Sequence, residues 1–133
     1  MCTVRRRLLC GLFGIALANV VIAADVPFTG VFSGTGRACY GKLFIRTKTI
    51  EWHTSFASCK QTPYKIIKTK LNATKPEIVF LLKARQSCDF GVVALDWDPE
   101  YPDYWNATGY RSLGDYKKKS DDTLRCNLER LDK

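Results

Sequence analysis

The spacing of the short apolar runs in this chain is the feature that most constrains its fold. Strand-type segments of six to nine residues recur between turn-forming stretches such as NATKP and RQS. No connection is long enough to hold a crossover helix, so neighbouring strands should pair antiparallel. The pattern predicts an all-β meander of about seven to eight strands, folded as a small antiparallel barrel or a sandwich.

Alternation within these segments divides their side chains between two faces. Leu43 and Ile45 fall on one parity of CYGKLFIRT, and Ile50 and Trp52 share a face of the next run, TIEWHTSF. The intervening RTKT is typical of a hairpin connection. The remaining predicted strands are an early one around Val31, then YKIIKTKL, EIVFLLK, DFGVVALDW, WNATGYRSL and TLRCNL. EIVFLLK is apolar on both parities, which predicts a central strand covered on both faces. The best helix candidate is short, over residues 113–119.

The N-terminal segment has the features of an export signal. Residues 1–24 contain three arginines, an apolar run from Leu8 and small residues at their end. This predicts a signal peptide cleaved before Asp25, followed by one all-β domain over residues 25–133. An uncleaved membrane anchor is the competing interpretation, but the apolar run is short for a span. No later segment is apolar enough to cross a bilayer, so we expect no transmembrane segment after signal removal.

Removal of that segment changes the charge of the chain. The full chain has a formal net charge of +8; without the three arginines, 18 basic side chains face 13 acidic ones, a net charge of +5. This balance does not favour nucleic acid as a partner. The compact arginine-headed signal predicts a periplasmic or secreted bacterial protein. In such a host the Asn-x-Thr sequons at Asn72 and Asn106 would carry no glycan.

Four cysteines remain after the predicted cleavage, at Cys39, Cys59, Cys88 and Cys126. An even number in a small exported domain predicts two disulfides. Three pairings are possible, and sequential hairpins favour Cys39 with Cys59 and Cys88 with Cys126. Each closure would contribute about 3–4 kcal/mol in the loop-entropy model. Zinc is disfavoured because no pair has the close spacing of zinc ligands, and we expect no metal or other cofactor.

Few residues offer catalytic chemistry. His53 is the only histidine and is expected to point outward if Trp52 points inward. With Glu51 as an orienting acid it could assist a serine, but nothing marks a nucleophile elbow. A carboxylate pair for glycoside cleavage could come from the acids between Asp96 and Asp103, yet no cleft is indicated around them. We therefore expect no catalytic residues and no enzyme activity.

The segment DWDPEYPDYW concentrates acids and aromatics in a basic chain. It could be a turn that ends a strand, with the acids as caps and Trp97 and Trp105 covering the core. It could be a binding loop, in which prolines hold the backbone, aromatics give contact area and acids attract a basic partner. A calcium loop is a third interpretation, although the EF-hand pattern is absent. The candidate binding residues are Asp96, Trp97, Asp98, Glu100, Tyr101, Asp103, Tyr104 and Trp105.

A basic stripe is the alternative binding surface. Lysines recur along YKIIKTKL and after the next strand, a pattern that could contact phosphate groups, lipid headgroups or an anionic polysaccharide of the envelope. Such lysines also protect edge strands and form solvated faces. The residues concerned are Lys65, Lys68, Lys70, Lys83 and Arg85.

Three features of the chain are informative together: the predicted signal, the strand count, and Cys88 with the late Cys126 in TLRCNL. In these features the chain resembles the small periplasmic inhibitors of C-type lysozyme. TGYRSL, from Thr108, is similar to a short serine- and tyrosine-containing loop of that family, with a different order of residues. The resemblance implies a β-barrel that inhibits a secreted protein, and it transfers no functional residues. A domain of net charge +5 would meet a basic lysozyme through its acidic segment from Asp96 to Asp103.

Overall fold

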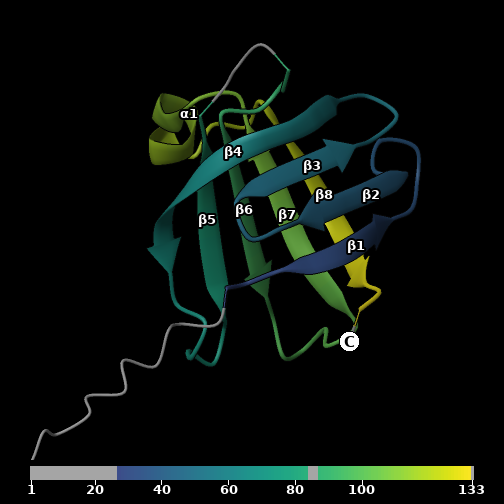
Figure 1. The fold of residues 1–133 in the computed structure, drawn as a ribbon. Helices are drawn as coiled ribbons and strands as arrows, with labels where there is room; N and C mark the ends of the chain where they lie inside the picture. The colour runs from purple at the N-terminus through teal and green to yellow at the C-terminus, as the bar shows by residue number, and fades with distance from the viewer. Residues whose placement is uncertain (1–26, 84–86, 133) are drawn as a thin grey trace, which may run out of the picture.

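Eight antiparallel strands form a closed barrel in sequence order, from β1 to β8 (Figure 1). The computed structural model describes residues 27–83 and 87–132; the predicted signal peptide over residues 1–24 lies outside them, as does Arg85. The strands are β1 (Gly30–Gly34), β2 (Gly41–Ile45), β3 (Thr49–His53), β4 (Ser58–Thr69), β5 (Glu77–Leu82), β6 (Val92–Trp97), β7 (Tyr104–Tyr110) and β8 (Thr123–Arg130). The predicted all-β antiparallel fold is confirmed, and the barrel is the alternative that the chain adopts.

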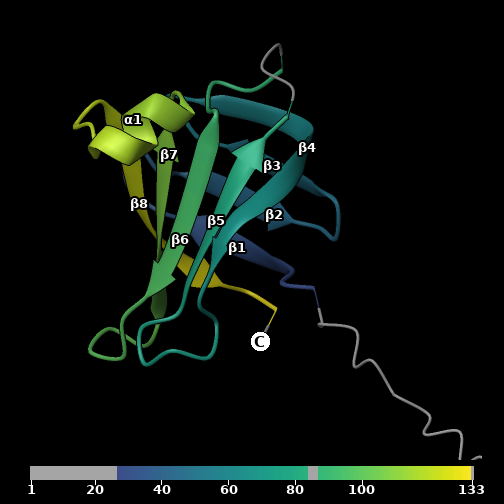
Figure 2. The ribbon, with the colours of Figure 1, turned by 90° about the vertical axis from the view of Figure 1, so that its left-hand side faces the viewer.

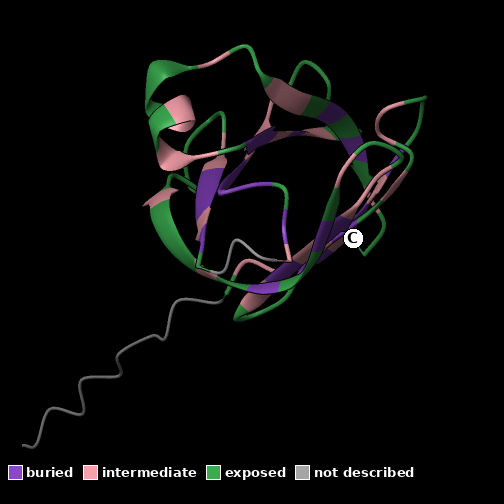
Figure 3. Ribbon diagram, turned by 90° about the horizontal axis from the view of Figure 1, so that it is seen from above, coloured by how far each residue is buried: buried purple, intermediate pink, exposed green. Residues whose placement is uncertain are grey.

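The first and last strands close the barrel. Phe32 of β1 lies opposite Arg130 of β8, and the Leu131 N–H donates a 2.8 Å hydrogen bond to the Val31 carbonyl. Figure 3 looks along the barrel and shows the strands forming a ring. Closure pairs the edge strands, which an open sheet of eight strands would leave exposed.

Alternate residues of each strand fill the interior. The Leu43, Ile50 and Trp52 side chains are completely buried and Ile45 almost so, which shows that the faces carrying these residues are the core faces. The predicted RTKT hairpin forms through a 2.9 Å bond from the Arg46 N–H to the Thr49 carbonyl. A closed barrel of this size is filled by side chains. The largest buried ones are Trp52, Phe32, Phe80, Leu43, Ile50, Ile78, Leu95 and Leu128.

One short helix, α1 (Leu113–Lys118), covers part of the outer wall, as Figure 2 shows. Val79 and Val92 are fully buried in a second apolar cluster outside the barrel, packed against Leu113 and Tyr116 of α1. This confirms that EIVFLLK is covered on both faces: the barrel core lies on one side and α1 on the other.

The cysteine pairing expected from the sequence is wrong. Cys39 is bonded to Cys126 and Cys59 to Cys88, instead of Cys39 with Cys59 and Cys88 with Cys126. Barrel closure places β8 beside β1, so the loop after β1 meets β8 across 87 residues of sequence. Cys59 forms a local antiparallel bridge with Cys88. Proximity along the chain therefore did not predict proximity across the barrel.

Candidate functional site

The turn between β6 and β7, residues 98–103, lies at the end of the barrel opposite α1 (Figures 1 and 2). Its backbone is fixed by local hydrogen bonds. The Trp97 Nε1–H donates to the Pro102 carbonyl at 3.1 Å, and the Glu100 N–H donates to the Asp98 carboxylate at 3.0 Å. The Tyr101 N–H also donates to the Asp98 carbonyl at 2.9 Å. An acid that accepts a bond from two residues on is a common turn-forming device.

Besides Asp98, three more of the eight candidate binding residues have side chains with structural contacts. Trp105 packs against Phe28 and Phe32, with ring centroids 5.4 and 6.1 Å apart, and covers one end of the core. Trp97 holds the turn through its indole N–H. Asp96 accepts a 3.0 Å hydrogen bond from the Asn106 side chain on the adjacent strand. These contacts match the interpretation of the segment as a capped turn.

The other acids and tyrosines reach solvent. Glu100 and Asp103 are exposed, and Tyr101 and Tyr104 are 66% and 49% exposed. Asp98 is half-buried and has a 3.5 Å ion pair with Lys75 from the neighbouring β4–β5 loop. The same short segment therefore combines a rigid turn with an exposed acidic and aromatic surface.

A hollow of about 350 Å³ opens beside this turn, lined by Asp98, Tyr101, Tyr104, Asn106 and Asn127. We call it the loop hollow. A neighbouring hollow on the outer wall shares two of its residues, Asn106 and Asn127. Asn127 was not predicted from the sequence, because β8 brings it opposite Asn106 only through the strand register. Carboxylate, phenol and amide groups thus converge on one concave surface.

The lysines of the alternative surface differ in exposure and in ion pairing. Lys65, Lys70 and Lys83 are exposed, whereas Lys68 forms a 3.1 Å ion pair with Glu77 that raises the pKa of the Lys68 ammonium. Arg85, the fifth predicted member, lies outside the described residues.

Aliphatic side chains are exposed among these lysines. A register shift between Ile66 and Lys68 interrupts the alternation of β4. Ile66 and Ile67 are 42% and 36% exposed as a result. A groove of about 670 Å³ adjoins this region and includes Ile66, Lys70 and Leu71 in its lining. The surface is therefore basic with an exposed apolar patch.

The histidine points outward, as expected, and takes part in a surface network. The Glu51 carboxylate contacts His53 Nε2 at 2.8 Å and Arg46 at 3.1 Å, and His53 Nδ1 lies 3.2 Å from the Ser58 hydroxyl. The hydrogen bond to His53 lowers the pKa of Glu51, and Arg46 adds to this against an opposing effect of burial. The imidazole side chain is 45% exposed on the outer wall, so water reaches this hydroxyl–imidazole–carboxylate arrangement freely.

Within the described residues, no group of three or more His, Cys, Asp or Glu side chains is placed to hold a metal ion. None of the helices in that part of the chain is long and apolar enough to span a membrane.

The two disulfides indicate an oxidising compartment, extracellular or periplasmic. The chain matches no protein-family model, curated protein or solved structure.

Proposed function

We propose that this protein is an exported, non-catalytic binding module whose main binding surface is the β6–β7 turn with the loop hollow. The observation that carries the proposal is the exposure of Tyr101 in a turn whose backbone is already fixed, and of Tyr104 at the start of β7 directly after it. Exposed aromatics on a rigid segment give contact area at low entropic cost, which is typical of binding hot spots.

The chemistry of the loop hollow favours a cationic group of a partner protein. Asp98 would supply the charge, the tyrosine rings would supply cation–π contacts, and Asn106 and Asn127 would supply amide oxygens. Lys75 already approaches Asp98 at 3.5 Å with a side chain that is 70% exposed. A partner's arginine or lysine would displace this weakly held lysine, because exposed ion pairs contribute little.

The most specific version is an inhibitor of a basic secreted hydrolase such as a lysozyme. The predicted signal peptide and the two disulfides support a location where such an enzyme is met. Glu100 and Asp103 flank the tyrosines and reverse the basic charge of the domain locally. Such a local reversal allows a basic partner to dock in one orientation.

Binding to a purified C-type lysozyme, followed by calorimetry, tests this proposal. Tyr101→Ala and Tyr104→Ala together should weaken binding at least about 100-fold, the effect of removing two hot-spot residues. Asp98→Asn should weaken binding about tenfold. Asp115→Asn, on α1 at the other end of the barrel, is the charge-matched control and should bind normally. No binding by the unmodified protein, or equal binding by all variants, would reject lysozyme recognition through this surface.

A second candidate is binding to anionic envelope material through the β4 lysines. It is favoured by the exposure of Ile66 and Ile67 beside Lys65 and Lys70, since shallow apolar insertion and basic charge act together at anionic membranes. Co-sedimentation with vesicles of phosphatidylglycerol, compared with phosphatidylcholine, tests it. A Lys65→Glu and Lys70→Glu variant should lose the phosphatidylglycerol-specific fraction, and equal sedimentation with both lipids would reject this candidate.

A further inference from the structure

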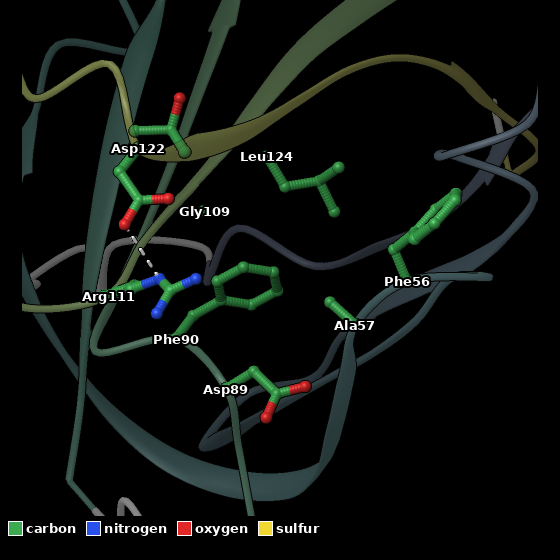
Figure 4. Close-up of a pocket in the computed structure, with 9 residues that line it drawn as sticks. Phe56, Ala57, Asp89, Phe90, Gly109, Arg111, Asp122 and Leu124 are labelled. Carbon is green, nitrogen blue, oxygen red and sulfur yellow. Dashed lines mark ion pairs between the residues drawn. The ribbon is translucent and has the colours of Figure 1, made fainter.

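A cavity of about 490 Å³ opens at the end of the barrel that carries α1, remote from the β6–β7 turn. We call it the mouth cavity. Figure 4 shows the residues around it, which come from the β3–β4 and β5–β6 connections, from β7 and its end, and from the start of β8. Ligand sites are often found in the mouths of β-barrels, and this volume suits a small molecule.

The phenyl ring of Phe90 forms the floor of the mouth cavity. Phe90 is only 5% exposed, and its ring packs 5.2 Å from the Trp52 ring in the core. A Cβ on Gly109 would lie 2.5 Å from this ring, so the glycine allows the ring to lie close against the β7 backbone. Together with Ala57 and Leu124, the ring gives the cavity an apolar centre.

The charged groups around this centre differ in their partners. Arg111 forms a 3.2 Å ion pair with Asp122 on one side of the Phe90 ring. The Asp89 carboxylate lies away from this ion pair in Figure 4 and accepts a 2.8 Å hydrogen bond from the Ser58 N–H. Among the described residues no cation is paired with Asp89. The lining therefore has one carboxylate in excess, in a chain that is basic overall.

Two exposed aromatics lie at the same end of the barrel. Phe56, in the β3–β4 connection, borders the mouth cavity and is 69% exposed; Tyr40, in the β1–β2 connection, is 72% exposed. The odd-numbered strands of the meander all end on this side, so both connections surround the same opening. Large apolar groups left in solvent around a concave site are typical of ligand entry.

We propose that the mouth cavity binds a small organic cation, an ammonium group carried on an aromatic body. The ring of the ligand would stack above Phe90, and the ammonium would pair with the Asp89 carboxylate. An anionic ligand is disfavoured because the Asp89 carboxylate would repel it and because it would have to compete with Asp122 for Arg111. This site is independent of the surface at the β6–β7 turn.

Three probes of similar size test the charge preference: 2-phenylethylamine, 2-phenylethanol and phenylacetate. Each is titrated into the folded protein while amide chemical shifts are followed by NMR. The ammonium should bind at least about tenfold more tightly than the alcohol, and the carboxylate more weakly still. The largest shifts should fall on residues around Phe90 and Leu124.

Two variants separate charge from contact. Asp89→Asn keeps the acceptor for the Ser58 N–H and should abolish the preference for the ammonium over the alcohol, whereas Phe56→Ala should weaken both alike. Glu129→Gln, an exposed position near the far end of β8 from the mouth cavity, is the charge-matched control and should bind the amine normally. Tighter binding of phenylacetate, an unchanged preference in Asp89→Asn, shifts confined to other surfaces, or no binding of the amine would overturn the proposal.

Discussion

Gly109 lies on β7 directly against the ring of Phe90, and its missing side chain decides how the barrel mouth is closed. A Cβ at this position would come within 2.5–2.9 Å of three atoms of that ring. Because the ring also packs on Trp52, it has little room to retreat into the core. In packing this tight, adding one methyl group at Gly109 would cause measurable strain.

Gly109→Ala should therefore destabilise the fold by about 1–3 kcal/mol, as measured by urea unfolding. Gly114→Ala is the matched control. Its added methyl would meet only the Ser112 hydroxyl at 3.7 Å, and in α1 it should stabilise by about 0.5–1 kcal/mol at most. Equal effects of the two substitutions would mean that Phe90 is not fixed where the mouth cavity requires it.

Glu51 links the surface network to pH. Hydrogen bonding to His53, helped by Arg46, holds the pKa of the Glu51 carboxyl below its ordinary value of 4.5. A carboxyl with a lowered folded-state pKa stabilises the fold fully above its ordinary value, and this contribution is lost as the pH falls through the lowered value.

When the pH is lowered from neutral to acid, the Glu51→Gln variant should accordingly lose less stability than the unmodified protein. The difference should stay below about 1 kcal/mol, because the groups lie at the surface. Urea unfolding at a series of pH values measures it, with Glu100→Gln in the exposed turn as control. Parallel stability profiles for the Glu51 variant and the unmodified protein would contradict the effect.

At the scale of elements, α1 is a short helix that depends on its ends and its packing. Six residues are too few for a helix to be stable alone in water. The Ser112 hydroxyl accepts a 3.1 Å bond from the Asp115 N–H, and Lys119 adopts the left-handed conformation that ends the helix. Tyr116 packs edge-on against Tyr110 at 5.3 Å and fixes α1 to the barrel wall.

Ser112→Ala should cost about 1 kcal/mol of stability, the usual effect of losing an N-cap. Hydrogen exchange should show faster exchange of the α1 amides, while the amides that form the β1–β2 hydrogen bonds remain protected. Ser55→Ala, in the exposed β3–β4 connection, serves as control and should change neither. A uniform acceleration across all strands would show instead that α1 and the barrel open together.

Elements were predictable from the sequence where the signal was local. The alternation around Leu43 and Trp52 separated the two faces of β2 and β3, since each strand needs only its own residues to show a period of two, and burial then shows which face lies in the core. Sites assembled from distant strands were not predictable in this way. Asn127 joins the loop hollow through its register with Asn106, and the mouth cavity collects residues from four separate segments.

At the scale of the whole molecule, barrel closure explains the cysteine pairing that local reasoning missed. The connection after β1 is distant from β8 in sequence but adjacent to it once the barrel closes. The Cys39–Cys126 bond thus ties the first part of the barrel to the last, whereas Cys59–Cys88 joins β4 to the connection before β6. The two bonds restrain very different lengths of unfolded chain.

Loop length therefore predicts unequal contributions from the two disulfides. The bonds span 87 and 29 residues, and the second lies within the loop closed by the first. Chain entropy gives about 4–5 kcal/mol for the longer closure and about 3.5 kcal/mol for the shorter one.

A Cys39→Ser and Cys126→Ser variant, which keeps only the shorter closure, should therefore be less stable than a Cys59→Ser and Cys88→Ser variant, which keeps only the longer one, by about 1 kcal/mol. Urea unfolding of the two variants and the unmodified protein measures this difference, with equal slopes required for the comparison. The reverse order would mean that local packing around Cys59 and Cys88, both in the buried core, outweighs the restraint that closes the barrel.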